Sequence, residues 1–221
     1  EFRRVLFRSF MISFAGTELP VLAQRAENLV VGAPCGLMDQ LSSYFGEPRK
    51  LLPIVCQPDL IQTPIAIPED ISFLGIDSGI RHSVGGSSYA DVRCAAFMGY
   101  TIIAQELGAT QKEIQNANDQ HDFSLLPYRG YLCAISVAEF ETRWKNKLPL
   151  TISGKDFISH YGNSIDRVTS INETQRYNLQ ACTAHPIYEN ERVHLFKQLL
   201  MSMEQANQDA RLKTITDRKS V

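Results

Sequence analysis

The segment from Tyr89 to Leu107 most constrains how this chain can fold. It is a long, mainly apolar run that ends at Gly108 and follows a polar, glycine-rich connection over residues 77–88. This pattern predicts a long apolar helix. Two strand-like runs precede it, Lys50 to Cys56 and Ile71 to Ile76, with prolines marking bends around them. The order of strand, loop and helix predicts a mixed α+β fold.

Helical periodicity recurs on both sides of this segment. Leu19 to Val31 carries apolar residues at three- and four-residue steps, and Gly32 and Pro34 end it. Further helices are predicted over 36–44, 138–147, 155–161 and 186–205, the last with Ile187, Val193, Phe196, Leu199 and Leu200 on one face. The polar stretch 109–122 is either a solvated helix or a mobile surface segment.

Length and composition limit the class of protein. The chain has 221 residues, 44% of them hydrophobic, which is enough for one large domain or two small ones. Its formal net charge is only -2, so neither nucleic acid nor an anionic membrane is expected as a partner. The apolar runs are too short to span a membrane, and we expect a soluble protein.

The cysteine pattern indicates the compartment. Five cysteines are widely spread and none forms a Cys-x-x-Cys pair. This pattern argues against a disulfide framework and against a zinc site, and it favours reduced thiols in the cytoplasm.

Both ends of the chain look foreign to the rest. Residues 1–9 and 217–221 resemble translated read-through of sequencing-library adapters, although a natural basic N-terminal segment is the alternative for the first of them. Such segments are excluded from fold reasoning. The remaining sequence, about 10–216, is therefore expected to come from a gene cut at both ends.

Two carboxylates are candidates for chemistry. Asp39 follows a Pro/Gly break and lies between Leu37-Met38 and Gln40-Leu41, so we expect an apolar surround of the kind that tunes a base. Glu27 precedes it by twelve residues, and the intervening turn can bring both towards one cleft, where Glu27 would hold Mg²⁺ beside ATP. The alternatives are a capping or surface aspartate and a solvated helix glutamate.

The glycine-rich loop adds a weaker signal. Arg81 and His82 lie in it, where a cation can meet phosphate charge or orient Asp39. Gly85-Gly86-Ser87-Ser88 lacks the Gly-x-x-x-x-Gly-Lys-Ser/Thr form, so a flexible turn is the better interpretation. The sequence contains neither a Gly-x-Ser-x-Gly elbow nor a His-Glu-x-x-His helix, so hydrolase motifs are absent.

These residues resemble a known family. Residues 23–28 with 31–40, and Asp-Ser-Gly-Ile-Arg-His-Ser at 77–83 with Tyr89 and Arg93, resemble the galactokinase branch of the GHMP kinases. A fuller agreement, with the L-arabinokinases, extends through residues 52–58, 75–86, 96–99, 131–133 and 183–190. The resemblance covers nearly all of 10–216.

The resemblance implies roles for five residues. Asp39 matches the catalytic aspartate that takes the proton of the sugar's anomeric hydroxyl, and Glu27 matches the glutamate that ligates Mg²⁺. Gly36 and Tyr89 match positions that contact the sugar, as Asp39 also does. Arg81 lies in a matching motif and is assigned a role near the transferred phosphate.

The resemblance also implies a two-lobed α+β GHMP-kinase fold. Residues 10–85 would be a partial N-terminal lobe, which is incomplete, and residues 86–216 a partial, helix-rich C-terminal lobe with a ferredoxin-like core. The family's phosphate loop and N-terminal sugar motif should lie before residue 10, and its third glycine-rich motif beyond Thr216. We therefore expect this polypeptide alone to have no useful kinase activity, because the backbone donors for the triphosphate are missing.

Three functions are compatible with the sequence. The first is an ATP-dependent sugar 1-kinase acting on L-arabinose, with a monosaccharide and ATP as its ligands and Mg²⁺ as its cofactor. The second is a galactokinase or another sugar 1-kinase. The third, of a different class, is a sugar-sensing regulator that kept the binding site and lost catalysis. The sequence does not indicate an oligomeric state.

Overall fold

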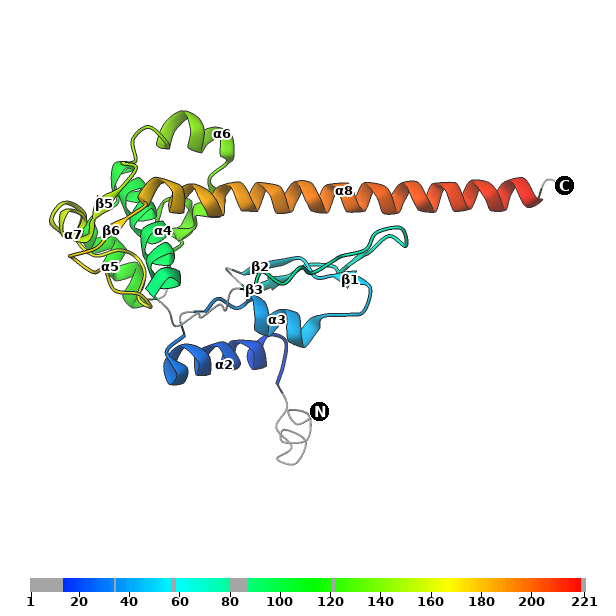
Figure 1. Cartoon of the computed structure of the whole chain (residues 1–221), viewed down its shortest axis with the longest axis horizontal. Coiled ribbons are helices and arrows are strands. Elements are labelled where there is room, and N and C mark those ends of the chain that lie inside the picture. Colours follow the sequence, from blue (N-terminus) through cyan, green and yellow to red (C-terminus); the bar gives the residue numbers. More distant parts are fainter. Residues whose placement is uncertain (1–13, 34, 57–58, 80–86, 121, 220–221) are drawn as a thin grey trace, which may run out of the picture. The chain divides into compact units, whose positions relative to one another are not determined.

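The chain divides into two compact units, residues 1–74 and 75–221, which are described separately. The computed structural model describes residues 14–33, 35–56, 59–79, 87–120 and 122–219 (Figure 1). Residues 1–9 and 220–221, which the sequence marks as adapter-like, lie outside this range, whereas residues 217–219 end a long helix. Both units combine helices with short antiparallel strands, so the mixed α+β character is confirmed.

The helices of the first unit follow the predicted periodicity. Helix α2 (Glu18–Ala26) continues directly into a single π-helical turn, η1 (Glu27–Val31). Gly32 ends this turn with φ 76°, a left-handed conformation that glycine adopts without steric cost. Helix α3 (Met38–Phe45) begins after the Pro/Gly break and packs against α2.

An interrupted hairpin arm completes the first unit. Strand β1 (Lys50–Leu51) pairs with β4 (Ile65–Ala66), and β2 (Ile54–Cys56) pairs with β3 (Asp59–Ile61), both antiparallel. Between the two ladders Gln62 donates its backbone N–H to the carbonyl of Pro53 at 3.0 Å. Pro53 and Pro64 have no N–H to donate, which explains the interruption.

One of the two predicted strands is wrong. The run at Lys50 to Cys56 does form strands, broken at Pro53, but no strand is assigned to Ile71–Ile76 within residues 71–79. The nearer segment 59–66 supplies the partner instead, since a hairpin closes over a short loop. Leu74 and Ile76 are left 90% and 94% exposed.

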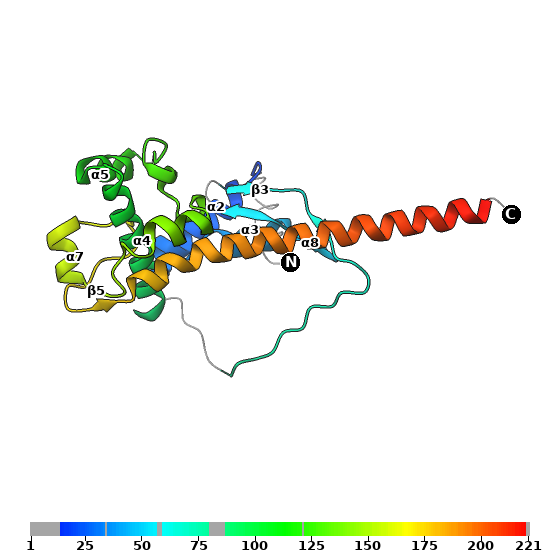
Figure 2. The same ribbon diagram turned by 90° about the horizontal axis from the view of Figure 1, so that it is seen from above.

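Helix α4 (Ser87–Glu106) is the centre of the second unit, as its apolar sequence predicts. Its residues 98–104 are all buried, and it packs along the first part of α8 (Leu179–Lys219). Gly99 allows the close approach, because a Cβ there would lie 1.8 Å from Oγ1 of Thr183. Beyond this contact α8 continues as one helix away from the other helices of its unit (Figures 1 and 2).

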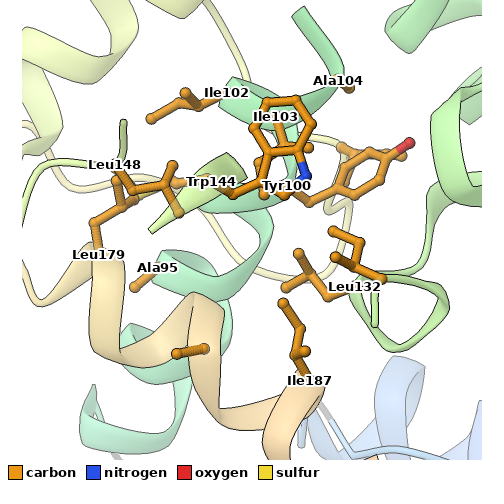
Figure 3. Packing of buried hydrophobic residues seen from close by; sticks show 14 of the residues in the cluster. Ala95, Tyr100, Ile102, Ile103, Ala104, Leu132, Trp144, Leu148, Leu179 and Ile187 are labelled. Carbon is orange, nitrogen blue, oxygen red and sulfur yellow. The ribbon is translucent and has the colours of Figure 1, made fainter. Parts of the chain in front are cut away.

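Large side chains from several elements fill the core around α4. Figure 3 shows Trp144, Tyr100, Leu148, Leu179 and Ile187 converging from separate segments. The hydroxyl of Tyr100 donates to the carbonyl of Pro127 at 2.7 Å, so this buried polar group is satisfied. Burial raises the pKa of Tyr100 far above its ordinary value.

Shorter elements surround this core. They are α5 (Gln111–Gln120), η2 (Pro127–Gly130), η3 (Leu132–Ala134), α6 (Val137–Glu139), η4 (Phe140–Trp144), α7 (Gly154–Tyr161) and the antiparallel pair β5 (Ile152–Ser153) and β6 (Arg176–Tyr177). Within the polar stretch 109–122, residues 111–120 thus form a helix. A capping box explains why: Thr110 Oγ1 accepts from the N–H of Glu113, whose carboxylate accepts from the N–H of Thr110 at 2.7 Å.

Helix α8 begins earlier than predicted. It starts at Leu179, so Pro186 lies inside it rather than in its first turn, and Pro186 removes one intrahelical hydrogen bond. Of the predicted apolar face, Ile187 is buried, whereas Val193 and Phe196 are exposed. Despite its length α8 is polar, and no described helix is both long and apolar enough to cross a membrane.

Candidate active site

Glu27 occupies an irregular position in the helix that carries it. It is the first residue of the π-helical turn η1, and its carbonyl accepts backbone hydrogen bonds from Gly32 and Ala33. A π-helical turn of this kind often occurs at functional sites. The side chain of Glu27 is half-buried.

Cys35 connects Glu27 to the second helix. Its Sγ donates to Oε2 of Glu27 at 3.3 Å and lies 3.5 Å from Oδ1 of Asn28. The Nε2 of Gln40, on α3, lies 3.8 Å from the same sulfur, and Gln24 of α2 donates to the carbonyl of Cys35 at 3.3 Å. We refer to Glu27, Asn28, Cys35 and Gln40 as the Cys35 network.

The electrostatics of this network keep the thiol protonated. Burial raises the pKa of Cys35, and the hydrogen bond to Glu27 and the negative charge of Glu27 raise it further. A protonated thiol is a donor, so it orients the carboxylate of Glu27 by a hydrogen bond to one of its oxygens. Sequence reasoning named Cys35 only as a motif residue and missed this contact.

Asp39 lies in the first turn of α3, one residue before Gln40 of the Cys35 network. The expected apolar surround is wrong in this structure, because Asp39 is exposed. The helical period explains this result: Leu37, Gln40 and Leu41 face inward, so Met38 and Asp39 face outward. The carboxylate is thus accessible to a substrate, while its neighbour in the chain is anchored.

Gly36 lies between Cys35 and α3, and its surroundings are open. A Cβ placed there would meet no atom within 4 Å. The first unit therefore brings Glu27, Cys35 and Gln40 into contact and leaves Gly36 and Asp39 exposed beside them.

The oxygen ligands in the first unit suit Mg²⁺. A carboxylate from Glu27 and an amide oxygen from Asn28 both lie against Cys35, and Mg²⁺ binds one or two such groups together with substrate phosphates. Among the described residues no group of three histidine, cysteine or acidic side chains is placed to hold a metal on its own. The residues fit a metal that is shared with a phosphate.

Tyr89 belongs to the second unit, in the first turns of α4, where it is half-buried. Arg93 lies one helical turn later on the same helix. Arg81 and His82 lie outside the described residues.

The structure reveals an ion pair next to Tyr89 that sequence reasoning missed. Arg93 Nε and Nη2 donate to the two oxygens of Asp166, each at 2.9 Å, and the side chain of Asp166 is only 2% exposed. Asp166 lies in a loop without periodicity, so the sequence carried no signal for it.

The sequence is similar to several named sugar kinases. The chain is 41% identical to the L-arabinokinase of Arabidopsis thaliana over 86% of its own length and 19% of that protein. It is also 41% identical to the galactokinase of Chloroflexus aggregans over 55% of its length and 30% of the relative, and 38% identical to that of Chloroflexus aurantiacus over 45% and 25%. These relatives, an L-arabinokinase and two galactokinases, belong to the GHMP kinase superfamily.

The relatives are named as sugar kinases, that is, as transferases. The chain spans less than a third of the length of each of these relatives. No family model matches the sequence, and no solved structure matches the fold.

Proposed function

We propose that this chain carries part of the active site of an ATP-dependent sugar 1-kinase that phosphorylates the anomeric hydroxyl of L-arabinose. The observation that carries the proposal is the 41% identity to an L-arabinokinase over 86% of the chain. The product is a sugar 1-phosphate, and ADP leaves.

Asp39 is the proposed catalytic base. Its exposed carboxylate accepts the proton of the anomeric hydroxyl as that oxygen bonds to the γ-phosphorus of ATP and the bond to the leaving ADP oxygen breaks. Gln40 anchors the adjacent backbone through Cys35, which limits how far the base can move. Phosphoryl transfer depends mainly on such placement and on neutralised charge.

Glu27, with Asn28 beside it, is the proposed Mg²⁺ ligand. When bound, Mg²⁺ neutralises charge that develops on the phosphate oxygens. Cys35 holds one carboxylate oxygen of Glu27 by a hydrogen bond, as outer groups commonly orient metal ligands. Gly36 and Tyr89 contact the sugar, and Arg81 acts near the transferred phosphate.

We propose that the complete protein has the two-lobed GHMP-kinase fold, with residues 10–85 in the N-terminal lobe and residues 86–216 in the C-terminal lobe with its ferredoxin-like core. It works in the cytoplasm on ATP and a monosaccharide. The 221-residue chain alone is inactive, so ATP-dependent sugar phosphorylation by the purified chain would refute that part.

A galactokinase is the second candidate, favoured by the 41% identity to the Chloroflexus aggregans enzyme over 55% of the chain. To separate the two, the longest reading frame that encodes this chain is assayed for ADP release with L-arabinose, D-galactose and a panel of other pentoses and hexoses. We expect the highest kcat/KM with L-arabinose and a product whose phosphorus couples to the anomeric proton in NMR. A preference for galactose contradicts the assignment to L-arabinose, and no activity with any sugar contradicts the kinase.

A further inference from the structure

The first turns of α4 are fixed by a loop that follows α7. Within residues 164–175, Asp166 pairs with Arg93, and Gln175 Nε2 donates to Oδ2 of Asp91 at 2.7 Å. Both contacts join segments that are more than 70 residues apart in the sequence. They lie within one helical turn of Tyr89, so they act on the part of the helix that carries it.

The carboxylate of Asp166 is held on all sides. Besides the two bonds from Arg93, it accepts from the N–H of Val168 at 3.2 Å and from the N–H and hydroxyl of Thr169 at 3.2 and 2.6 Å. Burial alone would raise the pKa of Asp166, but these donors and the charge of Arg93 outweigh it and lower the pKa. The pair is therefore a fixed, ionised contact.

The loop that carries Asp166 is itself anchored. The N–H of Gly154 donates to the carbonyl of Gln175 at 2.8 Å, and the N–H of Lys155 donates to the carbonyl of Glu173 at 3.1 Å. A Cβ at Gly154 would lie 2.1 Å from the carbonyl oxygen of Asn172, so the loop backbone packs directly on the start of α7. Asp166 thus offers Arg93 a rigid partner.

Arg93 connects this anchored loop to the helical turn that carries Tyr89. The two side chains are four residues apart on α4 and share one face of the helix. Burial alone would lower the pKa of Arg93, but Asp166 and, to a smaller extent, Tyr89 outweigh it and raise the pKa. The guanidinium of Arg93 also stacks 5.0 Å from the ring centroid of Phe97. Asp166, the helix and Phe97 therefore leave the guanidinium few alternative positions.

A buried ion pair is a costly way to gain stability. Replacing such a pair by apolar residues of similar size is often neutral or stabilising, so its presence calls for another reason. Here the pair joins a fixed loop to the helical turn that carries Tyr89, the residue proposed to contact the sugar.

We propose that the Arg93–Asp166 pair positions Tyr89 for the sugar, so that both residues determine sugar affinity without touching the substrate. This inference rests on the proposed function, because it assumes that Tyr89 contacts the sugar. Arg93 and Asp166 are positioning residues rather than catalytic ones. They act on binding of the sugar and leave the phosphoryl transfer step unchanged.

The kinetic test uses the longest reading frame that encodes this chain and compares Tyr89→Phe, Asp166→Asn and the double variant. We expect Tyr89→Phe and Asp166→Asn each to raise KM for the sugar roughly tenfold, the loss of about one good polar contact. The KM of the double variant for the sugar should be no higher than that of the more impaired single variant, because both changes remove the same contact. kcat and KM for ATP should change less than about twofold.

Two further variants complete the set. Arg93→Lys keeps the positive charge but cannot donate to both oxygens of Asp166 in the same geometry, so it should also raise KM for the sugar. This variant provides the test if Asp166→Asn does not fold. The control is Arg167→Lys. Arg167 lies on the same loop as Asp166, but it forms an exposed ion pair with Asp119. It should leave every kinetic constant unchanged.

A second measurement separates this inference from the proposed function. The 221-residue chain labelled with 3-fluorotyrosine gives a ¹⁹F resonance for Tyr89 that is assigned by its loss in Tyr89→Phe. Asp166→Asn and Arg93→Lys should move or broaden this resonance, and Arg167→Lys should not. An unmoved resonance, or effects of Tyr89→Phe and Asp166→Asn that simply add, overturns the inference. A moved resonance with an unchanged KM in Tyr89→Phe instead overturns the sugar contact and leaves the link to Tyr89 standing.

Discussion

The close contact between α4 and α8 at Gly99 predicts how far the two helices must separate when Gly99 is replaced. Gly99→Ala places a Cβ 1.8 Å from Oγ1, 2.8 Å from Cβ and 2.9 Å from Cγ2 of Thr183. Rotating the Thr183 side chain cannot relieve the contact with its Cβ. Since carbon atoms pack at about 3.5–4.0 Å, the helices must separate by roughly 0.7 Å or more.

The cost follows from this separation. Overpacking of this kind typically destabilises by about 1–3 kcal/mol, and the gain in helix propensity from glycine to alanine offsets up to about 1 kcal/mol. The shift also disturbs the bond of 2.7 Å from the Thr183 hydroxyl to the carbonyl of Leu179. We expect the melting temperature of the chain to fall by several degrees, at about 2–4 °C per kcal/mol.

The assay is thermal and urea unfolding of the 221-residue chain followed by circular dichroism. Gly75→Ala is the control, because a Cβ at Gly75 meets no atom within 4 Å. Thr183→Gly in the background of Gly99→Ala removes every clashing atom and should recover stability relative to the Gly99→Ala variant. If Gly99→Ala is as stable as the parent chain, or if the second change brings no recovery, the close crossing of the two helices is refuted.

Two further predictions follow from the charged groups. The lowered pKa of Asp166 means that its ion pair contributes stability above the ordinary carboxyl pKa of about 4, and that this contribution is lost as the pH falls through the lower folded value. Urea unfolding between pH 3 and pH 7 should therefore show a steeper loss of stability below pH 4 in the parent chain than in Asp166→Asn, and equal slopes would contradict the pair. Glu27→Gln removes a charge that raises the pKa of Cys35, so alkylation of Cys35 by iodoacetamide, followed by peptide mass spectrometry, should become faster near neutral pH. An unchanged rate would show that Glu27 and Cys35 are not coupled.

The helical part of the fold is readable from the sequence because its signals are local. Helix α4 and helix α7 lie within two residues of their predicted limits, since apolar periodicity and glycine stops act within one element. The strands were less predictable. The apolar run at Ile71 to Ile76 has strand character. Residues 59–66 are nearer in the sequence to the strands at 50–56, however, and pair with them instead.

The candidate site was predictable only in part. The motif around Asp39 and the spacing to Glu27 marked the two carboxylates as candidates, because these residues are near each other in the sequence. The expected apolar surround failed, since the inward positions of a short helix depend on what it packs against. The contact of Asp166 with Arg93 could not be predicted either. The two residues are 73 positions apart, and no local sequence pattern indicates such a contact.

The role of Asp39 is tested by the turnover of Asp39→Asn in the longest reading frame that encodes this chain. Asn keeps the size of the side chain and removes the base. With L-arabinose and ATP we expect kcat to fall by about 10²–10⁴-fold while the affinity for the sugar changes little. Asp70→Asn, at another exposed aspartate of the first unit, should behave like the parent enzyme. Near-normal turnover in Asp39→Asn would show that Asp39 is not the catalytic base.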